Sequence, residues 1–318
     1  MKIVILDGFS AVRNDLDWSL LEEFGTVIAY DRTRPEQTLG RCLGAEIVLT
    51  NKVILDAQTI KALPGLRYIG VLATGYNVVD LEAATSCGVT VTNIPAYSTE
   101  SVAQLIFAHL LNVVNRVDYY AVQNRSGRWG REPDMCYLDH SPFELCDKQI
   151  AFVGVGSIAT AAIRIAQAFG MKTVAVTSRS QQSLPAGVTR MSQQEAFSTS
   201  QVIALTCPLR DSNHHMINHQ TLSLMRPDTI LINTSRGPLV NDLDVAQALH
   251  DGKLAAYCAD VVTKEPPVDG NPLFEEPHCY TTPHIAWATF DARSRLVSIC
   301  RDNLKAFLNG TPQNVVNR

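Results

Sequence analysis

The sequence has no strong excess of charge of one sign and no long uninterrupted apolar run. Its 27 basic and 31 acidic residues leave a formal net charge of −4, which argues against a protein that binds nucleic acid by neutralising phosphates. The best candidate for a membrane span, residues 150–169, is interrupted by Arg164, and the N-terminal apolar run stops at Asp7. We therefore expect neither a membrane span nor a signal peptide.

Cysteine pairs of the C-x-x-C type are also absent, although the chain has eight cysteines. Zinc ribbons and thioredoxin-like sites are therefore not expected. His214, His215 and His219 lie close in sequence, but adjacent side chains do not face one way on a helix or a strand, so we predict no metal site there. Scattered cysteines in a chain of this length are typical of reduced thiols, and we expect a cytoplasmic protein.

Apolar residues make up 46% of the 318 positions, enough for the cores of two domains. In the first hundred residues, short runs rich in β-branched residues, such as 3–6 and 47–49, alternate with segments of helical spacing, such as 16–24 and 56–63. This alternation predicts an α/β fold with a parallel sheet covered on both faces. A second strand–helix series ends near His284.

Three other segments interrupt or end this pattern. Ser101–Gln104 has the form of a capping box at the start of a long helix. Residues 291–308 have the spacing of a C-terminal helix. Residues 126–148 are irregular, and a loop of this length is usually functional or part of an interface. Its Trp129 and Tyr137 either anchor the loop or cover the active site of a neighbouring subunit.

The segment Gly154-Val-Gly156-Ser-Ile-Ala159 follows an apolar strand and precedes a helical stretch. In this context, G-x-G-x-x-A indicates a dinucleotide-binding turn. Gly154 permits the tight turn, Gly156 lets the backbone approach a pyrophosphate, and Ala159 allows the helix to pack closely. The anion would lie at the helix N-terminus. The alternative is a glycine-rich turn needed only for packing.

The acid that this fingerprint expects about 20 residues further on is missing. The second strand ends instead in Ser178-Arg179-Ser180. A carboxylate would repel a 2′-phosphate, whereas Arg179 and two hydroxyls can bind one. We therefore predict NADP as the coenzyme, with NAD as second choice. In the alternative interpretation, Arg179 is a solvated surface residue and Ser178 binds the ribose weakly.

Three charged or titratable residues follow predicted strands of the second series. Arg236 comes after residues 230–233, Glu265 comes after residues 255–260, and His284 follows Thr282-Pro283. In open α/β sheets, ligands bind at the carboxyl ends of the strands. We therefore expect these three side chains to converge.

The segments around these residues resemble the D-isomer-specific 2-hydroxyacid dehydrogenase family. The similar segments occur in family order over nearly the whole chain, and they are Ala73–Ala84, Asn233–Val240, Asp260–Pro266 and Pro283–Thr289. Within the family, Pro95–Gln104 and Met135–Asp139 are most similar to glycerate dehydrogenases, also called hydroxypyruvate reductases.

The resemblance implies a fold and an activity. It implies a flavodoxin-like substrate domain from residues 1–100 and 289–318, an inserted Rossmann coenzyme domain from residues 101–288, and an active site between them. The implied reaction is reduction of a 2-oxoacid, hydroxypyruvate or glyoxylate, to a D-2-hydroxyacid such as D-glycerate. A homodimer formed through the coenzyme domains is also implied. The alternatives are a dehydrogenase for another 2-hydroxyacid and a coenzyme-sensing corepressor.

The chemistry expected of the three residues follows from their types. Arg236 offers a fixed fork of donors for the substrate carboxylate and ketone oxygen. His284 exchanges a proton with that oxygen, and Glu265 holds the imidazole and is expected to raise its pKa. The resemblance assigns the substrate carboxylate to backbone N–H groups of Ala73, Thr74 and Gly75, the pyrophosphate to Ser157 and Ile158, the adenosine side to Cys207 and Pro208, and the nicotinamide to Thr234, Asp260 and His284.

Overall fold

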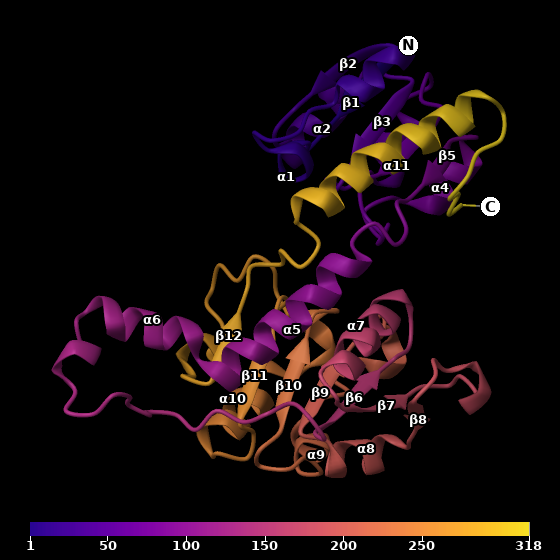
Figure 1. The fold of residues 1–318 in the computed structure, drawn as a ribbon. Coiled ribbons are helices and arrows are strands. Elements are labelled where there is room, and N and C mark those ends of the chain that lie inside the picture. Colours follow the sequence, from indigo (N-terminus) through magenta and orange to yellow (C-terminus); the bar gives the residue numbers. More distant parts are fainter. Residues whose placement is uncertain (318) are drawn as a thin grey trace. The chain divides into compact units, whose positions relative to one another are not determined.

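The computed structural model describes residues 1–317 and divides into two compact units. Unit 1 joins Met1–Ser98 to the C-terminal segment that begins at Trp287, and unit 2 comprises Thr99–Ala286. Both units are built on parallel sheets (Figure 1). Within the described residues, no helix combines the length and the apolar character needed to cross a bilayer.

Unit 1 contains a five-stranded sheet in the order β2-β1-β3-β4-β5. Its strands are β1 (Lys2–Ile5), β2 (Thr26–Ala29), β3 (Ile47–Thr50), β4 (Tyr68–Val71) and β5 (Thr90–Thr92). Its helices are α1 (Phe9–Val12), η1 (Ser19–Phe24), α2 (Pro35–Cys42), α3 (Ala57–Lys61), α4 (Leu81–Ser86) and α11 (Phe290–Leu308). This strand order is that of flavodoxin, so the predicted fold is confirmed.

Unit 2 contains a seven-stranded parallel sheet in the order β12-β11-β10-β9-β6-β7-β8. Its strands are β6 (Gln149–Val153), β7 (Lys172–Val176), β8 (Val188–Arg190), β9 (Val202–Leu205), β10 (Ile230–Asn233), β11 (Ala256–Ala259) and β12 (Cys279–Thr281). Its α-helices are α5 (Thr99–Asn115), α6 (Val117–Arg125), α7 (Ser157–Ala168), α8 (Gln193–Thr199), α9 (His219–Leu222) and α10 (Asp242–His250). Its 3₁₀ turns are η2 (Trp129–Arg131), η3 (Gln181–Ser183), η4 (Asp211–Asn213), η5 (Gly237–Leu239) and η6 (Pro272–Glu275).

The order of strands in unit 2 is that of the Rossmann fold, with β6 as its first strand and β12 as an added edge strand. The chain changes direction across the sheet between β6 and β9. Ligands of open α/β sheets bind outside the carboxyl ends of the strands at such a switch point. The fold therefore places the glycine turn that follows β6 at the position where a dinucleotide binds.

Several predicted boundaries were wrong. Helix α5 begins at Thr99, and the Ser101 hydroxyl donates to the carbonyl oxygen of Ala286 instead of capping the helix. Part of the predicted helix over residues 16–24 is the 3₁₀ helix η1. Strand β8 was missed because it has only three residues, of which Thr189 and Arg190 are exposed. An edge strand this short has too few residues to show the alternation of apolar and polar residues that predicts a strand.

The returning helix α11 is fixed in unit 1 by a buried arginine. Arg293 is 4% exposed, and its guanidinium donates to both carboxylate oxygens of Asp15 at 2.7 and 2.5 Å. It also donates to the carbonyl oxygens of Ala11, Val12 and Ala288. A buried guanidinium is tolerated only when its donors are paired. This cluster therefore ties the C-terminal helix to the start of the chain.

Replacing Arg293 with leucine should lower the free energy of unfolding by about 3 kcal/mol, because its charged hydrogen bonds to Asp15 and to three carbonyl oxygens are lost. Arg301→Leu is the matched control on the same helix. Its partner Glu23 is exposed, so the loss should be clearly smaller than in Arg293→Leu. Chemical denaturation measures the free energy of unfolding of both variants. Equal losses would contradict the conclusion that the Arg293 cluster ties α11 to the start of the chain.

The same pair predicts a pH dependence. The hydrogen bond from Arg293 lowers the pKa of the Asp15 carboxyl. A lowered folded-state pKa gives stability that is present above the unfolded-state pKa and is lost as the pH falls through the folded-state value. The stability difference between wild type and Arg293→Leu should therefore narrow in acid, as measured by denaturation at several pH values.

Candidate active site

Three of the predicted residues follow neighbouring strands of unit 2. Arg236 comes after β10, Asp260 directly follows β11, and His284 comes after β12. These strands are adjacent and parallel, with Ile232 opposite Cys258 and Cys258 opposite Tyr280. The carboxyl ends of parallel strands meet at one edge of a sheet, so the three segments lie along the same edge.

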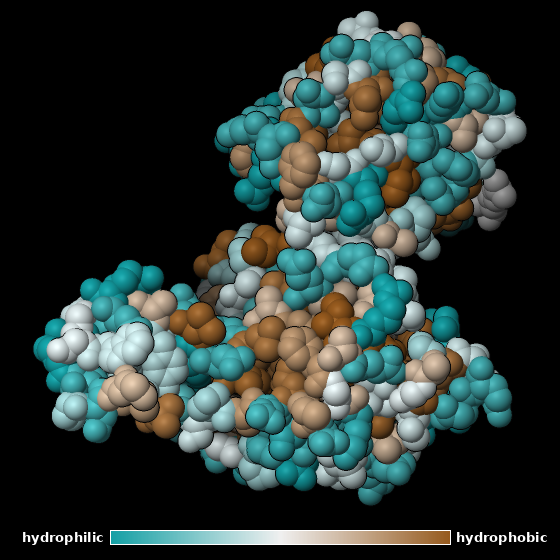
Figure 2. Space-filling model, in the orientation of Figure 1, coloured by the Kyte–Doolittle hydropathy of each residue, from teal (hydrophilic) through white to brown (hydrophobic). Residues whose placement is uncertain are grey.

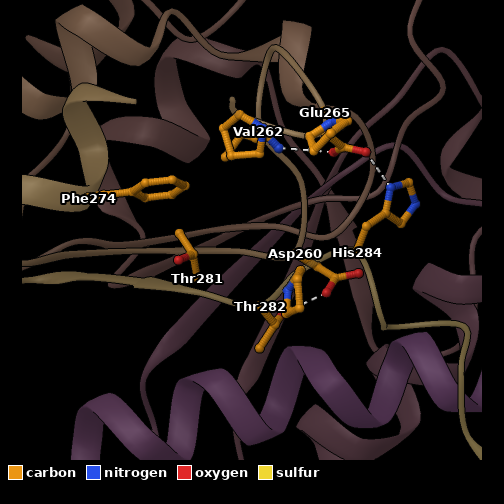
Figure 3. Close-up of a pocket in the computed structure, with 10 residues that line it drawn as sticks. Asp260, Val262, Glu265, Phe274, Thr281, Thr282 and His284 are labelled. Carbon is orange, nitrogen blue, oxygen red and sulfur yellow. Dashed lines mark hydrogen bonds and ion pairs between the residues drawn. The ribbon is translucent and has the colours of Figure 1, made fainter. Parts of the chain in front are cut away.

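Glu265 and His284 form a hydrogen-bonded pair (Figure 3). His284 Nδ1 lies 2.5 Å from Glu265 Oε2, and Glu265 Oε1 accepts a hydrogen bond of 3.0 Å from the backbone N–H of Val262. Both side chains are about one-third exposed. Since an ionised carboxylate only accepts hydrogen bonds, Nδ1 carries the proton. The imidazole is oriented by this bond, and Nε2 is the atom that can exchange a proton with a ligand.

The backbone of His284 has an unusual conformation that Asp260 holds in place. Its φ is +54°, a left-handed value that is uncommon outside glycine. The His284 N–H donates to the carbonyl oxygen of Asp260 at 2.8 Å, and the next two backbone N–H groups, of Ile285 and Ala286, donate to the Asp260 carboxylate. Asp260 is 1% exposed. Sequence reasoning missed this role, because it depends on a turn that follows the next strand of the sheet.

The loop that carries Arg236 is packed against the loop that carries Glu265. A Cβ on Gly237 would lie 1.9 Å from the carbonyl oxygen of Val262, a distance that no side chain tolerates. The Asn233 side chain donates to the Arg236 carbonyl oxygen and so closes the turn after β10. Arg236 itself is exposed, and its guanidinium donates to the carbonyl oxygen of Ser235 at 2.7 Å. Only glycine at position 237 allows these two loops to approach.

A cavity of about 340 Å³ lies beside the Glu265–His284 pair. Phe274, Pro266 and Thr281 are among the residues that line it, and Figure 3 shows the Phe274 ring opposite the Glu265–His284 pair. The volume is within the range of small-molecule pockets. An acid–base pair therefore stands at the edge of a mainly apolar hollow.

The glycine turn after β6 has the geometry that a pyrophosphate requires. Gly154 has a φ of +92°, and a Cβ there would lie 2.8 Å from the Cα of Cys207. A Cβ on Gly156 would meet open space. Gly156 is the N-cap of α7 and has no side chain to occupy the first N–H groups of the helix. The N-terminus of α7, at Ser157 and Ile158, is therefore accessible to an anion.

Two guanidinium groups, one from each of two neighbouring strands, lie at the end of β7. Ser178, Arg179 and Ser180 follow the strand closely, and Arg179 is exposed there. Arg190, at the end of the neighbouring strand β8, donates from Nε to the carbonyl oxygen of Thr177 at 3.1 Å. Sequence reasoning missed Arg190 because it had not predicted β8.

Other predicted residues are placed by the structure as follows. Cys207 is half-buried against Gly154, and the carbonyl oxygen of Pro208 accepts a hydrogen bond from Asn213. Thr234 is buried after β10. Ala73, Thr74 and Gly75 belong to unit 1, where they follow β4. There the Thr74 hydroxyl donates to the carbonyl oxygen of Ile94 at 3.0 Å.

Comparison with known proteins identifies relatives along the whole chain. A hydroxypyruvate reductase of Blautia hydrogenotrophica is 41% identical over 322 aligned positions that cover all of both chains. A glycerate dehydrogenase of Methylorubrum extorquens is 36% identical and covers 99% of this chain and 98% of its own. Among solved structures, the TT0316 protein of Thermus thermophilus has a TM-score of 0.87 at 30% identity and covers 99% of this chain and 100% of its own.

The family model described as the NAD binding domain of D-isomer specific 2-hydroxyacid dehydrogenases matches residues 107–286, which lie inside unit 2 and contain the glycine turn and the Glu265–His284 pair. The predicted resemblance is thereby confirmed. This protein belongs to the D-isomer-specific 2-hydroxyacid dehydrogenase family.

Proposed function

We propose that this protein reduces hydroxypyruvate, or the related glyoxylate, to the D-2-hydroxyacid with a hydride from NADPH. The observation that carries the proposal is the Glu265–His284 pair, which stands at the same sheet edge as Arg236. A positioned acid–base imidazole and a guanidinium are what the reduction of a 2-oxoacid requires. The full-length similarity to a hydroxypyruvate reductase supports this choice of substrate.

In this mechanism, the Arg236 guanidinium binds the substrate carboxylate and polarises the ketone oxygen. The coenzyme, when bound, supplies the hydride to the carbonyl carbon. As negative charge grows on the ketone oxygen, His284 donates the proton on Nε2 to it. The Glu265 carboxylate keeps the ring oriented and stabilises the imidazolium through the Nδ1 hydrogen bond. In the direction of oxidation, the neutral imidazole accepts the proton.

The coenzyme is assigned to unit 2 and the substrate carboxylate in part to unit 1. The N–H groups of Ser157 and Ile158 would hold the pyrophosphate, and Cys207 and Pro208 would flank the adenosine. Thr234 and Asp260 would lie beside the nicotinamide. In unit 1, the backbone N–H groups of Ala73, Thr74 and Gly75 would bind the substrate carboxylate.

The preference for NADP rests on the end of β7. Ser178, Arg179 and Ser180 stand where NAD-dependent folds carry an acid, and Arg190 adds a second guanidinium beside Thr177. Two guanidiniums and two hydroxyls provide charge-assisted donors for a 2′-phosphate. The tripeptide 178–180 has no carboxylate to bind the ribose hydroxyls of NAD in the usual way.

A homodimer is the assembly that we propose, and α6 with the segment 126–148 would form its interface. None of the residues of α6 is buried, and this part of unit 2 projects from the sheet (Figure 1). The segment is nevertheless ordered by its own contacts, including the Arg128–Asp139 ion pair and a hydrogen bond from the Trp129 indole to Met135.

Exposed apolar side chains support this interface. Trp129, Met135 and Leu138 are 54%, 88% and 74% exposed. Apolar residues also gather on the face of unit 2 around α5 and α7 (Figure 2). Exposed apolar side chains that cluster on a projecting segment such as 126–148 are normally covered by a partner chain.

The eight cysteines are unpaired, which supports a reducing location such as the cytoplasm.

Purified protein should oxidise NADPH when hydroxypyruvate is added, as measured by the loss of coenzyme absorbance. His284→Gln should lower kcat by about 10²–10⁴-fold, since the general acid is removed, and Arg236→Ala should lower kcat/KM by at least about 10²-fold. His250→Gln is the control, because His250 is exposed at the end of α10, before β11 begins. No turnover with either coenzyme would refute the proposed activity.

Arg179→Asp should shift the ratio of kcat/KM for NADPH to that for NADH toward NADH by about 10–100-fold, because a charge-assisted bond is replaced by repulsion. Arg190→Ala should shift the ratio in the same direction. Lys172→Asp, at the other end of β7, makes the same change of charge away from the proposed phosphate. If both arginine variants keep the wild-type ratio, Arg179 and Arg190 do not bind the 2′-phosphate of NADP.

In solution the protein should have a mass about twice that of the 34.9 kDa chain. Met135→Lys combined with Leu138→Lys should yield monomers, because two charges would be desolvated at the interface. The control pair is Leu43→Lys with Leu243→Lys, which are exposed apolar positions elsewhere. Light scattering after gel filtration measures the mass of the wild type, of the Met135→Lys Leu138→Lys variant and of the control variant. A dimer that persists in the Met135→Lys Leu138→Lys variant would exclude this interface.

A further inference from the structure

Helix α5 contains a buried histidine that the proposed reaction does not use. His109 is 6% exposed and lies on the same helix as the core residues Ile106 and Leu110, which pack against the sheet of unit 2. Its Nε2 is 3.3 Å from the hydroxyl oxygen of Thr282. Figure 3 shows α5 as the purple helix that runs past Thr282 and Asp260. The histidine therefore reaches the segment that carries His284.

The direction of the hydrogen bonds from His109 is fixed by the protons available. The Thr282 hydroxyl donates its one proton to Asp260 Oδ1 at 2.6 Å. The Thr282 oxygen is then an acceptor toward His109, so Nε2 of His109 must carry a hydrogen. The chain of bonds runs from the imidazole N–H of His109 through the hydroxyl of Thr282 to the carboxylate of Asp260.

This chain of bonds ends on the group that fixes the catalytic turn. The carboxylate of Asp260 accepts N–H groups from Ile285 at 2.8 Å and from Ala286 at 2.7 Å, and its backbone carbonyl accepts the N–H of His284. A left-handed residue such as His284 persists only where its surroundings hold it. A carboxylate that rotated away from these N–H groups would release that conformation.

Helix α5 contacts the turn at a second point. The Ser101 hydroxyl donates to the carbonyl oxygen of Ala286 at 2.5 Å. Ser101 and His109 are both buried on α5, and they reach opposite ends of the segment 282–286. One helix therefore braces both ends of the turn that presents His284.

Burial favours the neutral form of His109. Burial lowers the pKa of its imidazole, and the charge of Asp260 opposes that shift only in part. A neutral ring has a single N–H, and the geometry places it on Nε2. The alternative role is simple packing, in which the ring fills space and its hydrogen bond has no consequence for the turn.

We propose that His109 is a positioning residue, which orients the Thr282 hydroxyl toward Asp260 and so holds the turn that presents the His284 imidazole. The proposal rests on the proposed function for its kinetic consequence, since His284 is the acid–base group there. Its structural part concerns only groups of this chain and is tested without substrate.

The first experiment is nitrogen-15 NMR of the imidazole rings in uniformly labelled wild-type protein at neutral pH, with the His109 signals assigned by their loss in His109→Gln. The expected result is a ring that carries a hydrogen on Nε2, as the chain of bonds requires. A ring protonated at Nδ1 alone would overturn the proposal, because its Nε2 would have no hydrogen to donate to the Thr282 oxygen. This result is independent of whether hydroxypyruvate is the substrate.

The second experiment compares the kinetics of two variants. In His109→Gln, the side-chain amide nitrogen can take the place of the imidazole Nε2 as a donor, so this variant should retain the wild-type kcat. His109→Leu cannot donate and should lower kcat about tenfold, as expected for one lost hydrogen bond, with KM for the oxoacid unchanged. Gln104→Leu, an exposed position on α5, is the control.

These outcomes separate the possible failures. If the wild type lacks activity, the proposed function is wrong. The NMR experiment still tests whether His109 donates a hydrogen bond to Thr282. If His109→Leu is less stable to heat yet keeps the wild-type kcat, the histidine only packs and the proposal is wrong. Equal losses of kcat in His109→Gln and His109→Leu would also overturn it, since the restored donor would have had no effect.

Discussion

The candidate active site depends on a buried carboxylate. Asp260 is almost fully removed from solvent, and its oxygens accept hydrogen bonds from the Thr282 hydroxyl and from two successive backbone N–H groups beyond His284. A carboxylate in such surroundings is stable only when its oxygens are bonded. The left-handed backbone of His284, the direction of its ring and the pairing with Glu265 all follow from the turn that these bonds define.

Close backbone contacts assemble the rest of the site. Gly237 allows the loop after β10 to lie against Val262, whose N–H orients Glu265. Gly154 plays the corresponding part at the coenzyme turn, where a side chain would collide with Cys207. In both places the function of glycine is to bring two loops closer than any Cβ permits. The loops that carry the ligand-binding side chains are thus brought together by glycines, which have no side chain.

Much of this was readable from the sequence because it is local. The alternation of apolar runs and helical spacing predicted the parallel α/β units, and both strand orders agree with the predicted folds. The segments around Arg236, Glu265 and His284 indicated the family, which the comparisons confirm. Short or exposed elements were harder, as the three-residue strand β8 illustrates, because two exposed residues give no alternation to read.

The sequence by itself determined which chemical groups are available: a guanidinium, a carboxylate and an imidazole after three strands, and a glycine turn without the usual acid beyond it. Only the tertiary structure decided how they are held. Arg190 joins the end of β7 through strand pairing, and His109 reaches the Thr282–Asp260 pair from a helix that lies far earlier in the chain. Pairings of this kind depend on packing between distant segments, and local patterns do not encode them.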